Sequence, residues 1–451
     1  MSIALIVLAA GKGTRMQSDL PKVLHKIAHA PMLWYAMRAG SVLEPEHSIV
    51  VAGHGADLVE ASAKDFDPEA QVVLQTEQLG TAHAVAQAKP ALDGFEGDAL
   101  VLYGDTPFIR QETLEAMAEA RAQNDVVVLG FEAADPGRYG RLVTDGEELM
   151  RIVEFKDASP QERNITLCNS GVIAAKSDVL FDLIDAVENN NASGEYYLTD
   201  IVAIARSRGL SASVVRCDEA ETLGVNSRAE LATAESLFQT RARAELVENG
   251  VSLLAPDSVY LSWDTVIGRD AEVEQNVVFG PDVTVESGAR IRAFSHLEGA
   301  HVSRGAVVGP YARLRPGAEL AEDTHVGNFV EIKNAQLHQG AKANHLTYIG
   351  DAEIGEKTNI GAGTITCNYD GVFKHKTTIG KQAFIGSNTM LVAPVTIGND
   401  AMTASGSVVT SDVPDGAMAL ARAKQVNKEG FATKLFAMLR AKKAKKQAQN
   451  D

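Results

Sequence analysis

The sequence has few of the features that mark secreted or membrane-bound proteins. Its 451 residues include three cysteines, Cys168, Cys217 and Cys367, whose wide spacing excludes a disulfide framework and fits no zinc motif. No apolar run approaches the length that spans a membrane. The apolar start, MSIALIVLAAGKG, has neither the basic flank nor the small-residue cleavage site of a signal peptide. We therefore expect a cytoplasmic protein with no membrane insertion.

The sequence also contains fewer positively than negatively charged residues. Lysine and arginine total 42 against 59 aspartates and glutamates, so the formal net charge is −17. Because binding to phosphate backbones requires a basic face, no nucleic-acid partner is expected. The remaining composition is ordinary, with 45% hydrophobic and 22% charged residues, which provides a sizeable core and excludes wholesale disorder.

The character of the chain changes near residue 228. Before that point, short apolar runs alternate with amphipathic stretches, of which 23–43 and 111–123 suit helices. This alternation predicts a Rossmann-like α/β domain with a largely parallel sheet. The predicted strands cover residues 3–9, 47–52, 71–74, 99–103 and 125–131.

A helical segment separates this first domain from the rest of the chain. Ser227 and Glu230 form a capping-box pattern, and Gly250 is a natural stop. We predict a first domain over residues 1–228, a linker helix over 229–249 and a second domain over 250–451.

The second domain carries a six-residue apolar repeat, often followed by glycine as in Ile267-Gly268. This period is typical of hexapeptide parallel β-helices, in which three units close one triangular coil of about 18 residues. As a class these β-helices are left-handed, although spacing alone does not show the hand. The repeat positions are Ile267, Val273, Phe279, Val285, Ile291, Leu297, Val302, Val308, Leu314, Leu320, Val326, Ile332, Ile354, Ile360, Ile379, Ile385, Leu391 and Ile397.

Two segments depart from the repeat. The turn-rich string CNYDGVFKHKTT, residues 367–378, interrupts it, and we expect a loop pushed out of the solenoid, of the kind that often carries function. Four lysines within residues 442–446 predict a solvated or disordered basic tail.

The first predicted strand runs into the glycine-rich string LAAGKGTRM, residues 8–16. Glycines at such a point let backbone N–H groups approach phosphate oxygens. The Walker A spacing is absent, and so is the third glycine of the dinucleotide fingerprint. Lys12, Arg15 and Lys22 add positive charge. The structural alternative is an ordinary strand–helix turn with surface cations.

Asp105 follows the predicted strand at 99–103, at the edge where ligands bind in open α/β sheets. Its carboxylate suits Mg²⁺, which takes one or two carboxylates plus substrate phosphates, and Asn226 offers a second oxygen. A turn aspartate and an Asx turn at the helix entry are the alternatives. Gln75 suits a pyrimidine edge, and Glu154 and Asn169 suit sugar hydroxyls, but each is equally compatible with a structural role.

In the second domain, Arg315 and Lys333 are separated by one full coil of the predicted β-helix. They should stack at one corner of successive coils, about 4.8 Å apart at the backbone. Two such cations repel each other unless an anion, such as a sugar phosphate, lies between them. His345 is a candidate general base, because a neutral imidazole accepts a proton from an attacking amine. Independent surface cations and a structural histidine are the alternatives.

Taken together, the motifs LAAGKGTRM, Pro21-Lys22, QTEQLGTAHA, YGD, GRYGR, GEYYLTD and the hexapeptide half resemble a known bacterial family. These are the bifunctional N-acetylglucosamine-1-phosphate uridyltransferases/glucosamine-1-phosphate acetyltransferases. The resemblance covers nearly the whole chain, with both domains in order. It implies an enzyme that uses UTP, acetyl-CoA and Mg²⁺, forms a homotrimer and supplies peptidoglycan and lipopolysaccharide precursors.

The resemblance also implies a role for each site residue. His345 is the acetyltransferase base, and Asp105 and Asn226 hold Mg²⁺. The residues that bind glucosamine 1-phosphate are Arg315, Lys333, Tyr348 and Asn359, and those that bind acetyl-CoA are Ala362, Asn368, Tyr369, Ser387, Ser405 and Arg422. The residues that bind the nucleotide sugar are Leu8, Ala9, Ala10, Gly11, Lys22, Gln75, Gly80, Thr81, Tyr103, Gly104, Asp105, Gly140, Glu154, Asn169 and Asn226, with Gly13 and Arg15 in the phosphate loop.

Two other interpretations stay open at the level of sequence. A single-activity sugar-1-phosphate nucleotidyltransferase with a regulatory β-helix would not need Arg315, Lys333 and His345 together. A non-catalytic trimeric scaffold or sugar-nucleotide binder would not need Asp105 together with Asn226.

Overall fold

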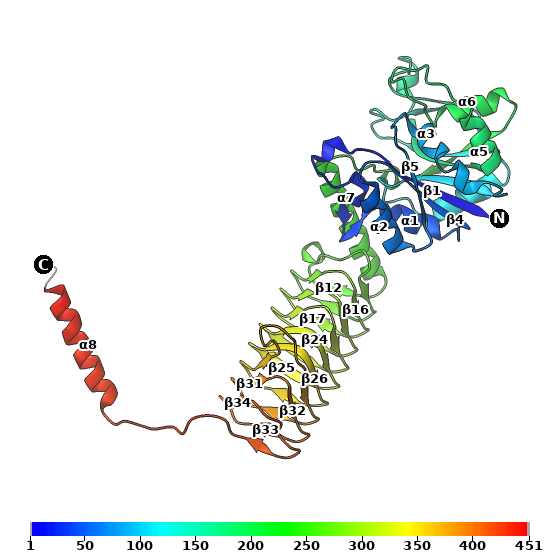
Figure 1. Cartoon of the computed structure of the whole chain (residues 1–451). Coiled ribbons are helices and arrows are strands. Elements are labelled where there is room, and N and C mark those ends of the chain that lie inside the picture. Colours follow the sequence, from blue (N-terminus) through cyan, green and yellow to red (C-terminus); the bar gives the residue numbers. More distant parts are fainter. Residues whose placement is uncertain (1, 449–451) are drawn as a thin grey trace. The chain divides into compact units, whose positions relative to one another are not determined.

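The computed structural model describes residues 2–448 and divides into two compact units (Figure 1). The first unit comprises Met1–Leu246 together with Tyr260–Thr265, and the second comprises Val247–Val259 and Val266–Asp451. Helix α7, Arg228–Glu248, belongs to the first unit as far as Leu246.

The first unit is built on a nine-stranded sheet in the order β5-β4-β1-β6-β10-β7-β11-β9-β8. Strands β5, β4, β1 and β6 are parallel, but β10 runs antiparallel to both β6 and β7. The prediction of a largely parallel sheet holds for these four strands and for the pair β7–β11, but it is wrong for the pairings of β10, β9 and β8, which are antiparallel. The described residues between β7 and β10 form no α-helical crossover, which a parallel connection would need. The strands are β1 Ile3–Ala9, β4 His47–Ala52, β5 Gln71–Leu74, β6 Asp98–Tyr103, β7 Val126–Glu132, β8 Arg141–Asp145, β9 Glu148–Val153, β10 Leu167–Lys176 and β11 Ala212–Cys217.

Strand β1 is buried on both faces, as a continuous apolar run predicts. Its two faces belong to separate hydrophobic clusters, one containing Ala4, Ile6 and Leu8 and the other Leu5, Val7 and Ala9. Leu8 pairs with Tyr103 of β6, and the backbone N–H of Gly104 donates to the carbonyl of Leu8 at 2.9 Å. The segments that follow β1 and β6 therefore start side by side at one edge of the sheet.

The predicted helix over residues 23–43 is wrong in its first half. Strands β2, Lys26–Ile27, and β3, Ala30–Pro31, form a hairpin there, and Ala28 and His29 at its turn have φ of 45° and 73°, which a right-handed helix excludes. The helices are α1 Met32–Ser41, α2 Ala56–Phe66, α3 Thr81–Ala86, α4 Gln111–Arg121, α5 Ser177–Ile184, α6 Asp200–Ser207 and α7, with 3-10 turns η1 Thr14–Met16, η2 Lys22–Leu24, η3 Lys89–Leu92, η4 Glu162–Asn164 and η5 Glu219–Glu221.

Only half of the predicted capping box at α7 is present. Ser227 Oγ accepts from the N–H of Glu230 at 3.3 Å, but the Glu230 carboxylate accepts from the N–H of Asn226 at 2.6 Å, one position before the expected donor. The helix entry therefore orients the backbone of Asn226.

The second unit is a parallel β-helix, as the six-residue period predicts (Figure 1). Val285 pairs with Val302 in the next coil, and Val302 pairs with Leu320 in the coil after that. The repeat positions therefore stay paired from coil to coil, although the repeat is one residue shorter between Leu297 and Val302. Repeat positions point inward, and Val273 and Phe279 are fully buried.

Short strands form the faces of the coils. The 3-10 turn η6, Pro256–Ser258, lies between the first two of these strands, β12 and β13. One sheet contains β12 Ser252–Leu253, β14 Glu272–Val273, β17 Arg290–Ile291, β20 Val307–Val308, β23 His325–Asn328, β25 Lys342–His345, β27 Asn359–Ile360, β30 Phe384–Ile385, β33 Met402–Thr403 and β35 Met418–Ala419. The other strands are β13 Val266–Ile267, β15 Val278–Phe279, β16 Val283–Val285, β18 His296–Leu297, β19 Ala300–Val302, β21 Arg313–Leu314, β22 Ala318–Leu320, β24 Glu331–Leu337, β26 Tyr348–Ile354, β28 Ile365–Cys367, β29 Thr377–Ile379, β31 Met390–Val392, β32 Val395–Ile397 and β34 Val408–Val409.

A loop leaves the coil where the sequence predicts one. Strand β26 pairs with β28 through Tyr348 and Ile365, which are about one coil apart in the chain. The same strand pairs with β29 through Ala352 and Thr377, which are separated by much more than one coil. Residues 368–376, called the extruded loop below, are therefore additional to the coil.

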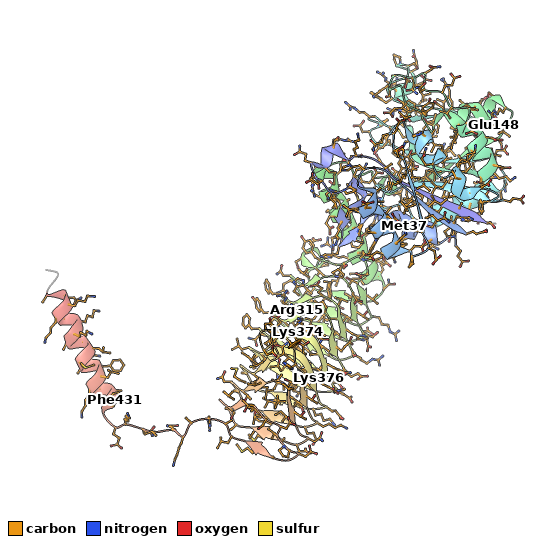
Figure 2. The ribbon with its side chains drawn as sticks, viewed as in Figure 1. Met37, Glu148, Arg315, Lys374, Lys376 and Phe431 are labelled. Atoms are coloured by element: carbon orange, nitrogen blue, oxygen red, sulfur yellow. The ribbon has the colours of Figure 1, made fainter. Side chains whose placement is uncertain are left out.

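The basic tail is helical and exposed. Helix α8, which starts at Phe431 (Figure 2) and covers Phe431–Gln447, has no buried residue, so the predicted solvent exposure is confirmed. The segment is helical because alanine, lysine and leucine, which fill much of it, are strong helix formers. Within residues 2–448, none of the helices combines the length and apolar character that crossing a membrane demands.

Candidate active sites

The first candidate site lies where strands β1 and β6 end. A cavity of about 270 Å³ opens there, and Gln78 closes part of it by donating from Nε2 to the carbonyl of Ala10 at 2.8 Å. Ten residues predicted to bind the nucleotide sugar line this cavity: Leu8, Ala9, Ala10, Gly11, Lys22, Gln75, Gly80, Thr81, Tyr103 and Asp105. Gln78 and Glu195 also line it and were not among the predicted site residues.

Gly13 allows the glycine-rich segment to lie against Lys22. It has φ of 60°, and a Cβ added there would lie 2.6 Å from Lys22 Cβ, closer than real side chains approach. Arg15 is on η1, exposed to solvent and outside the lining of the cavity. Glycine at position 13 thus allows the close approach to Lys22, and the role of Arg15 in the phosphate loop stays a prediction.

Lys22 connects the two predicted metal ligands. Its Nζ donates to Asp105 Oδ2 and, at 3.0 Å, to Asn226 Oδ1, and the Lys22 and Asp105 side chains are only 13% and 16% exposed. A cation therefore already lies between one carboxylate oxygen and one amide oxygen. No cluster of three or more His, Cys, Asp and Glu side chains suited to a metal exists within residues 2–448.

This donor set fits Mg²⁺. The ion prefers oxygen ligands and is usually held by one or two carboxylates, with waters and substrate phosphates completing its shell. The Asp105 and Asn226 oxygens are already brought together by a positive charge. The residues present therefore suit a metal that arrives with a nucleotide.

A second cavity, of about 340 Å³, adjoins the first because Tyr103 and Asp105 line both. Asn226 and Arg138 are among its other lining residues. Burial, followed by the nearby carboxylates of Asp105 and Glu154, raises the pKa of Tyr103, which keeps its hydroxyl neutral between the two cavities. Asp105, a predicted metal ligand, therefore borders both cavities, and Asn226, the other predicted metal ligand, borders the second.

Three further predicted residues meet one another. A Cβ on Gly140 would lie 3.4 Å from Glu154 Oε1 and 3.5 Å from Asn169 Cβ, and the N–H of Asn169 donates to the carbonyl of Gly140 at 2.9 Å. Burial raises the pKa of Glu154, which accepts a hydrogen bond from Thr199 Oγ1 at 3.3 Å. The missing side chain at Gly140 leaves access to a carboxylate and an amide.

The segment from Gln75 to Thr81 is held at both ends by contacts within the chain. Gln75 is buried and donates from Nε2 to the carbonyl of Gly80 at 3.1 Å. Thr81 Oγ1 accepts from the N–H of Leu198 at 2.9 Å. Gly80 has φ of 119°, and a Cβ there would collide with the backbone of Tyr196. The segment thus forms one wall of the cavity.

The second candidate site is on the β-helix, where Arg315 and Lys333 stack as their one-coil spacing predicts. The N–H of Arg315 donates to the carbonyl of Ile332 in the next coil at 2.9 Å. Arg315 Nη1 also lies 2.8 Å from Glu331 Oε1. Lys374 from the extruded loop, and more weakly Arg315, lower the pKa of Lys333, so three cations converge (Arg315 and Lys374 are labelled in Figure 2). Lys374 was missed by the sequence analysis.

His345 has a partner that fixes its tautomer. Its Nδ1 lies 2.7 Å from Asn328 Oδ1, in the paired residue of the neighbouring strand. Because an amide oxygen only accepts, Nδ1 is the donor, and in the neutral imidazole Nε2 then presents a lone pair. His345 itself is exposed. This is the arrangement that a general base needs, and Asn328 was missed by the sequence analysis.

Tyr348 and Asn368 come together around Gly350. A Cβ on Gly350 would collide with the Tyr348 hydroxyl and the Asn368 amide, and Asn368 Nδ2 donates to Asp351. Thr347 Oγ1 donates to the carbonyl of His345 at 2.7 Å, so His345 and Tyr348 flank one corner. The predicted base and one predicted sugar-phosphate ligand are thus neighbours.

The remaining predicted residues occupy successive coils. Asn388, next to Ser387, donates its N–H to the carbonyl of Ala362 at 2.7 Å, and Gly406, next to Ser405, donates to the carbonyl of Ser387 at 2.8 Å. These three predicted acetyl-CoA residues therefore form a column. Asn359 lies on β27, which pairs with β25, the strand of His345. Tyr369 and Arg422 are exposed, on the extruded loop and after β35.

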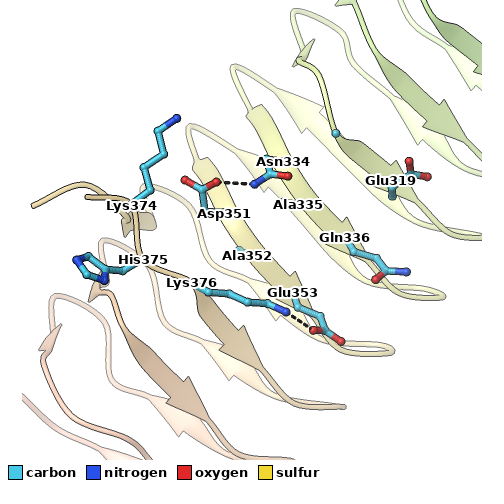
Figure 3. Close-up of a pocket in the computed structure, with 11 residues that line it drawn as sticks. Glu319, Asn334, Ala335, Gln336, Asp351, Ala352, Glu353, Lys374, His375 and Lys376 are labelled. Carbon is cyan, nitrogen blue, oxygen red and sulfur yellow. Dashed lines mark hydrogen bonds and ion pairs between the residues drawn. The ribbon is translucent and has the colours of Figure 1, made fainter. Parts of the chain in front are cut away.

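A cavity of about 490 Å³ lies between the extruded loop and the β-helix face (Figure 3). The loop contributes Lys374, His375 and Lys376 to its lining, and β26 contributes Asp351 and Glu353. In Figure 3, Lys376 points towards Glu353, whereas His375 points away from the strands. The extruded loop and strand β26 thus border one cavity, and Lys374 is among its lining residues.

Family comparisons agree with both halves. Residues 5–160 match the family described as MobA-like NTP transferase domain, and residues 376–411 match bacterial transferase hexapeptide repeats. Together with the two sites, these matches define a nucleotidyltransferase domain joined to a hexapeptide transferase domain.

Curated relatives share this whole arrangement. Over 395 residues, 88% of each chain, the sequence is 70% identical to "Bifunctional protein GlmU" of a Ruegeria species, and the match to the protein of that name from Ruegeria pomeroyi has the same identity and coverage. The GlmU of a Jannaschia species is 64% identical over 393 residues, 87% of each chain. The chain belongs to the family of bifunctional GlmU proteins, and the predicted family is confirmed.

Proposed function

We propose that this chain is a bifunctional enzyme that makes UDP-N-acetylglucosamine. The second unit acetylates glucosamine 1-phosphate with acetyl-CoA, and the first unit transfers UMP from UTP to the product and releases pyrophosphate. One observation carries the proposal: a single chain, similar to GlmU over 88% of its length, contains both the Asp105–Asn226 oxygen pair and the cation–histidine group on the β-helix.

Mg²⁺ is the metal for the first site, held by Asp105 and Asn226. When bound, it supplies charge shielding for the triphosphate. Lys22, which donates to both of these oxygens, would supply a further positive charge for the phosphates.

The chain's own residues in the first site bind and orient the substrates. Backbone N–H groups of residues 8–11 contact phosphate, Gln75 contacts the uracil edge, and Glu154 and Asn169 accept or donate hydrogen bonds at the sugar. A phosphate oxygen of N-acetylglucosamine 1-phosphate attacks the α-phosphorus of UTP. The new P–O bond forms as the bond to pyrophosphate breaks, so positioning and charge stabilisation supply the catalysis.

In the second site, Arg315 and Lys333 hold the phosphate of glucosamine 1-phosphate, with Tyr348 and Asn359. His345 Nε2 takes a proton from the sugar amine as the nitrogen attacks the thioester carbon of acetyl-CoA. The C–N bond forms, the C–S bond breaks, and coenzyme A leaves as a thiol after His345 returns the proton. The acetyl donor is bound by Ala362, Asn368, Tyr369, Ser387, Ser405 and Arg422.

We infer that the protein acts in the cytoplasm as a homotrimer and provides precursor for peptidoglycan and lipopolysaccharide. Residues 1–228 carry uridylyl transfer, 229–249 form the linker helix, and 250–451 carry acetyl transfer. With these boundaries, uridylyl transfer should depend on residues within 1–228, and acetyl transfer should depend on residues within 250–451.

The test is incubation of the protein with glucosamine 1-phosphate, acetyl-CoA, UTP and Mg²⁺, followed by mass detection of products. The bifunctional enzyme forms UDP-N-acetylglucosamine from this mixture. A single-activity nucleotidyltransferase forms it only from added N-acetylglucosamine 1-phosphate, and a non-catalytic scaffold forms none. Either of the last two results would overturn the proposal.

A further inference from the structure

The extruded loop is attached to the β-helix at both of its ends. At its start, Asn368 Nδ2 donates to Asp351. At its end, Lys376 Nζ lies 2.7 Å from Glu353 Oε2 (Figure 3). Asp351 and Glu353 are both on β26, so one strand anchors both ends.

A third carboxylate, Asp370, ties the tip of the loop together. Its Oδ1 accepts from the N–H groups of Val372 and Phe373 at 2.8 and 2.7 Å, and its Oδ2 lies 2.6 Å from His375 Nε2. The N–H of Asp370 also donates to the carbonyl of Phe373 at 3.2 Å. Asp370 therefore joins both arms of the hairpin through one side chain.

Hydrogen bonds, rather than apolar packing, stabilise the tip of the extruded loop. Val372 and Phe373 are 75% and 68% exposed, so burial contributes little to its order. Contact with His375 and the two N–H groups lowers the pKa of Asp370 to about 2, which keeps the carboxylate charged at neutral pH.

The two arms carry residues that face different parts of the second site. Asn368, on the first arm, contacts Asp351 beside Gly350. Lys374, on the other arm, is the main cause of the lowered pKa of Lys333, and Tyr369 and Lys374 pair across the hairpin. Both arms therefore carry residues of the second site, and the hairpin that Asp370 holds joins them.

We propose that Asp370 is a positioning residue for acetyl transfer. By tying His375 to the turn, it holds Asn368 and Tyr369 in place for acetyl-CoA and Lys374 beside the phosphate-binding cations. This inference rests on the proposed function, because the substrates of the second unit are assigned there. Asp370 touches no reacting atom and acts through the loop.

The experiment compares full-length wild type, Asp370→Ala and Asp370→Asn. For Asp370→Ala we expect KM for acetyl-CoA and for glucosamine 1-phosphate to rise about tenfold, with kcat within about twofold, because His345 and Asn328 are untouched. Asp370→Asn keeps an oxygen for the turn N–H groups, so its KM values should rise less. Chymotrypsin should cut after Phe373 faster in Asp370→Ala than in wild type.

The matched control is Glu286→Ala. Glu286 also accepts from a histidine Nε2, that of His301 at 2.9 Å, and from a backbone N–H, that of Arg304 at 3.0 Å, but it lies several coils from the loop. It should leave both KM values and the cleavage rate unchanged.

Wild-type KM values for both substrates in Asp370→Ala would overturn the inference, as would an equal effect of Glu286→Ala. If Asp370→Ala does not fold, as judged by thermal unfolding, the same comparison is made with Asp370→Asn. Absence of acetyl transfer in wild type would instead refute the proposed function, and the chymotrypsin assay would still test whether Asp370 orders the loop.

Discussion

The hydrogen bond between Asn328 and His345 predicts a graded loss of acetyl transfer. Replacing Asn328 with alanine removes the acceptor that lies 2.7 Å from His345 Nδ1, so the imidazole loses its preferred tautomer and orientation. A neutral hydrogen bond is worth about 0.5–1.5 kcal/mol net, which corresponds to about a 2- to 13-fold fall in kcat. Loss of the base itself, in His345→Ala, should cost about 10²–10⁴-fold.

The assay is steady-state release of the coenzyme A thiol, with uridylyl transfer measured on the same preparations. Uridylyl transfer should be unchanged in both variants, because their residues are in the second unit. Asn328→Asp, which keeps an acceptor oxygen, should retain most of the acetyl transfer that Asn328→Ala loses.

A double-mutant cycle shows whether Asn328 acts through His345. In a His345→Ala background, Asn328→Ala should cause no further loss, since the partner is already gone. A loss of equal size in both backgrounds would refute the reasoning, because Asn328 would then act on something other than the base.

Three further predictions concern other parts of the two sites. Asp105→Ala should abolish pyrophosphate release from UTP and leave acetyl transfer intact, because it removes the anionic ligand proposed for Mg²⁺; near-normal release would count against that ligand. Arg315→Ala should raise KM for glucosamine 1-phosphate by roughly tenfold or more, since a charge-assisted contact is worth about 1.5–3 kcal/mol, and calorimetry should show acetyl-CoA binding little changed. Burial raises the pKa of Glu154, so the folded state loses stability as pH rises through the unfolded carboxyl range towards the folded pKa. Glu154→Gln should therefore unfold at a higher temperature than wild type at neutral pH and at the same temperature below about pH 4, and an unchanged difference across pH would contradict the assignment.

The regular parts of the fold were predictable because burial imposes a period on the sequence. The apolar runs at 3–9, 47–52 and 71–74 are strands with those bounds, and the six-residue repeat gives the coil register. The hairpin before α1 was not predictable, because its turn places Ala28 and His29 at positive φ, a conformation that their residue types do not favour. The antiparallel insertion of β10 depends on pairing between distant strands, which local patterns do not encode.

The same distinction applies to the sites. Register alone brings Arg315 next to Lys333. Asp105 follows strand β6, whereas Lys22 lies on η2 and Asn226 lies just before α7, so the meeting of these three residues depends on contacts between distant segments. Coil arithmetic would also have found Asn328, which lies one coil before His345 and is paired with it. The position of Lys374 could not be predicted from the coil length, because Lys374 lies in the extruded loop, which interrupts the register.

The central claim is that two reactions occur at separate centres on one chain, and one measurement tests it directly. His345→Ala and Asp105→Ala are each supplied with glucosamine 1-phosphate, acetyl-CoA, UTP and Mg²⁺, alone and as an equal mixture, and the products are detected by mass. Each variant alone should form UDP-N-acetylglucosamine at no more than about a hundredth of the wild-type rate, whereas the mixture should form it readily, because each variant supplies the step that the other lacks. A mixture as inactive as its components, or full activity of either variant alone, would contradict the account.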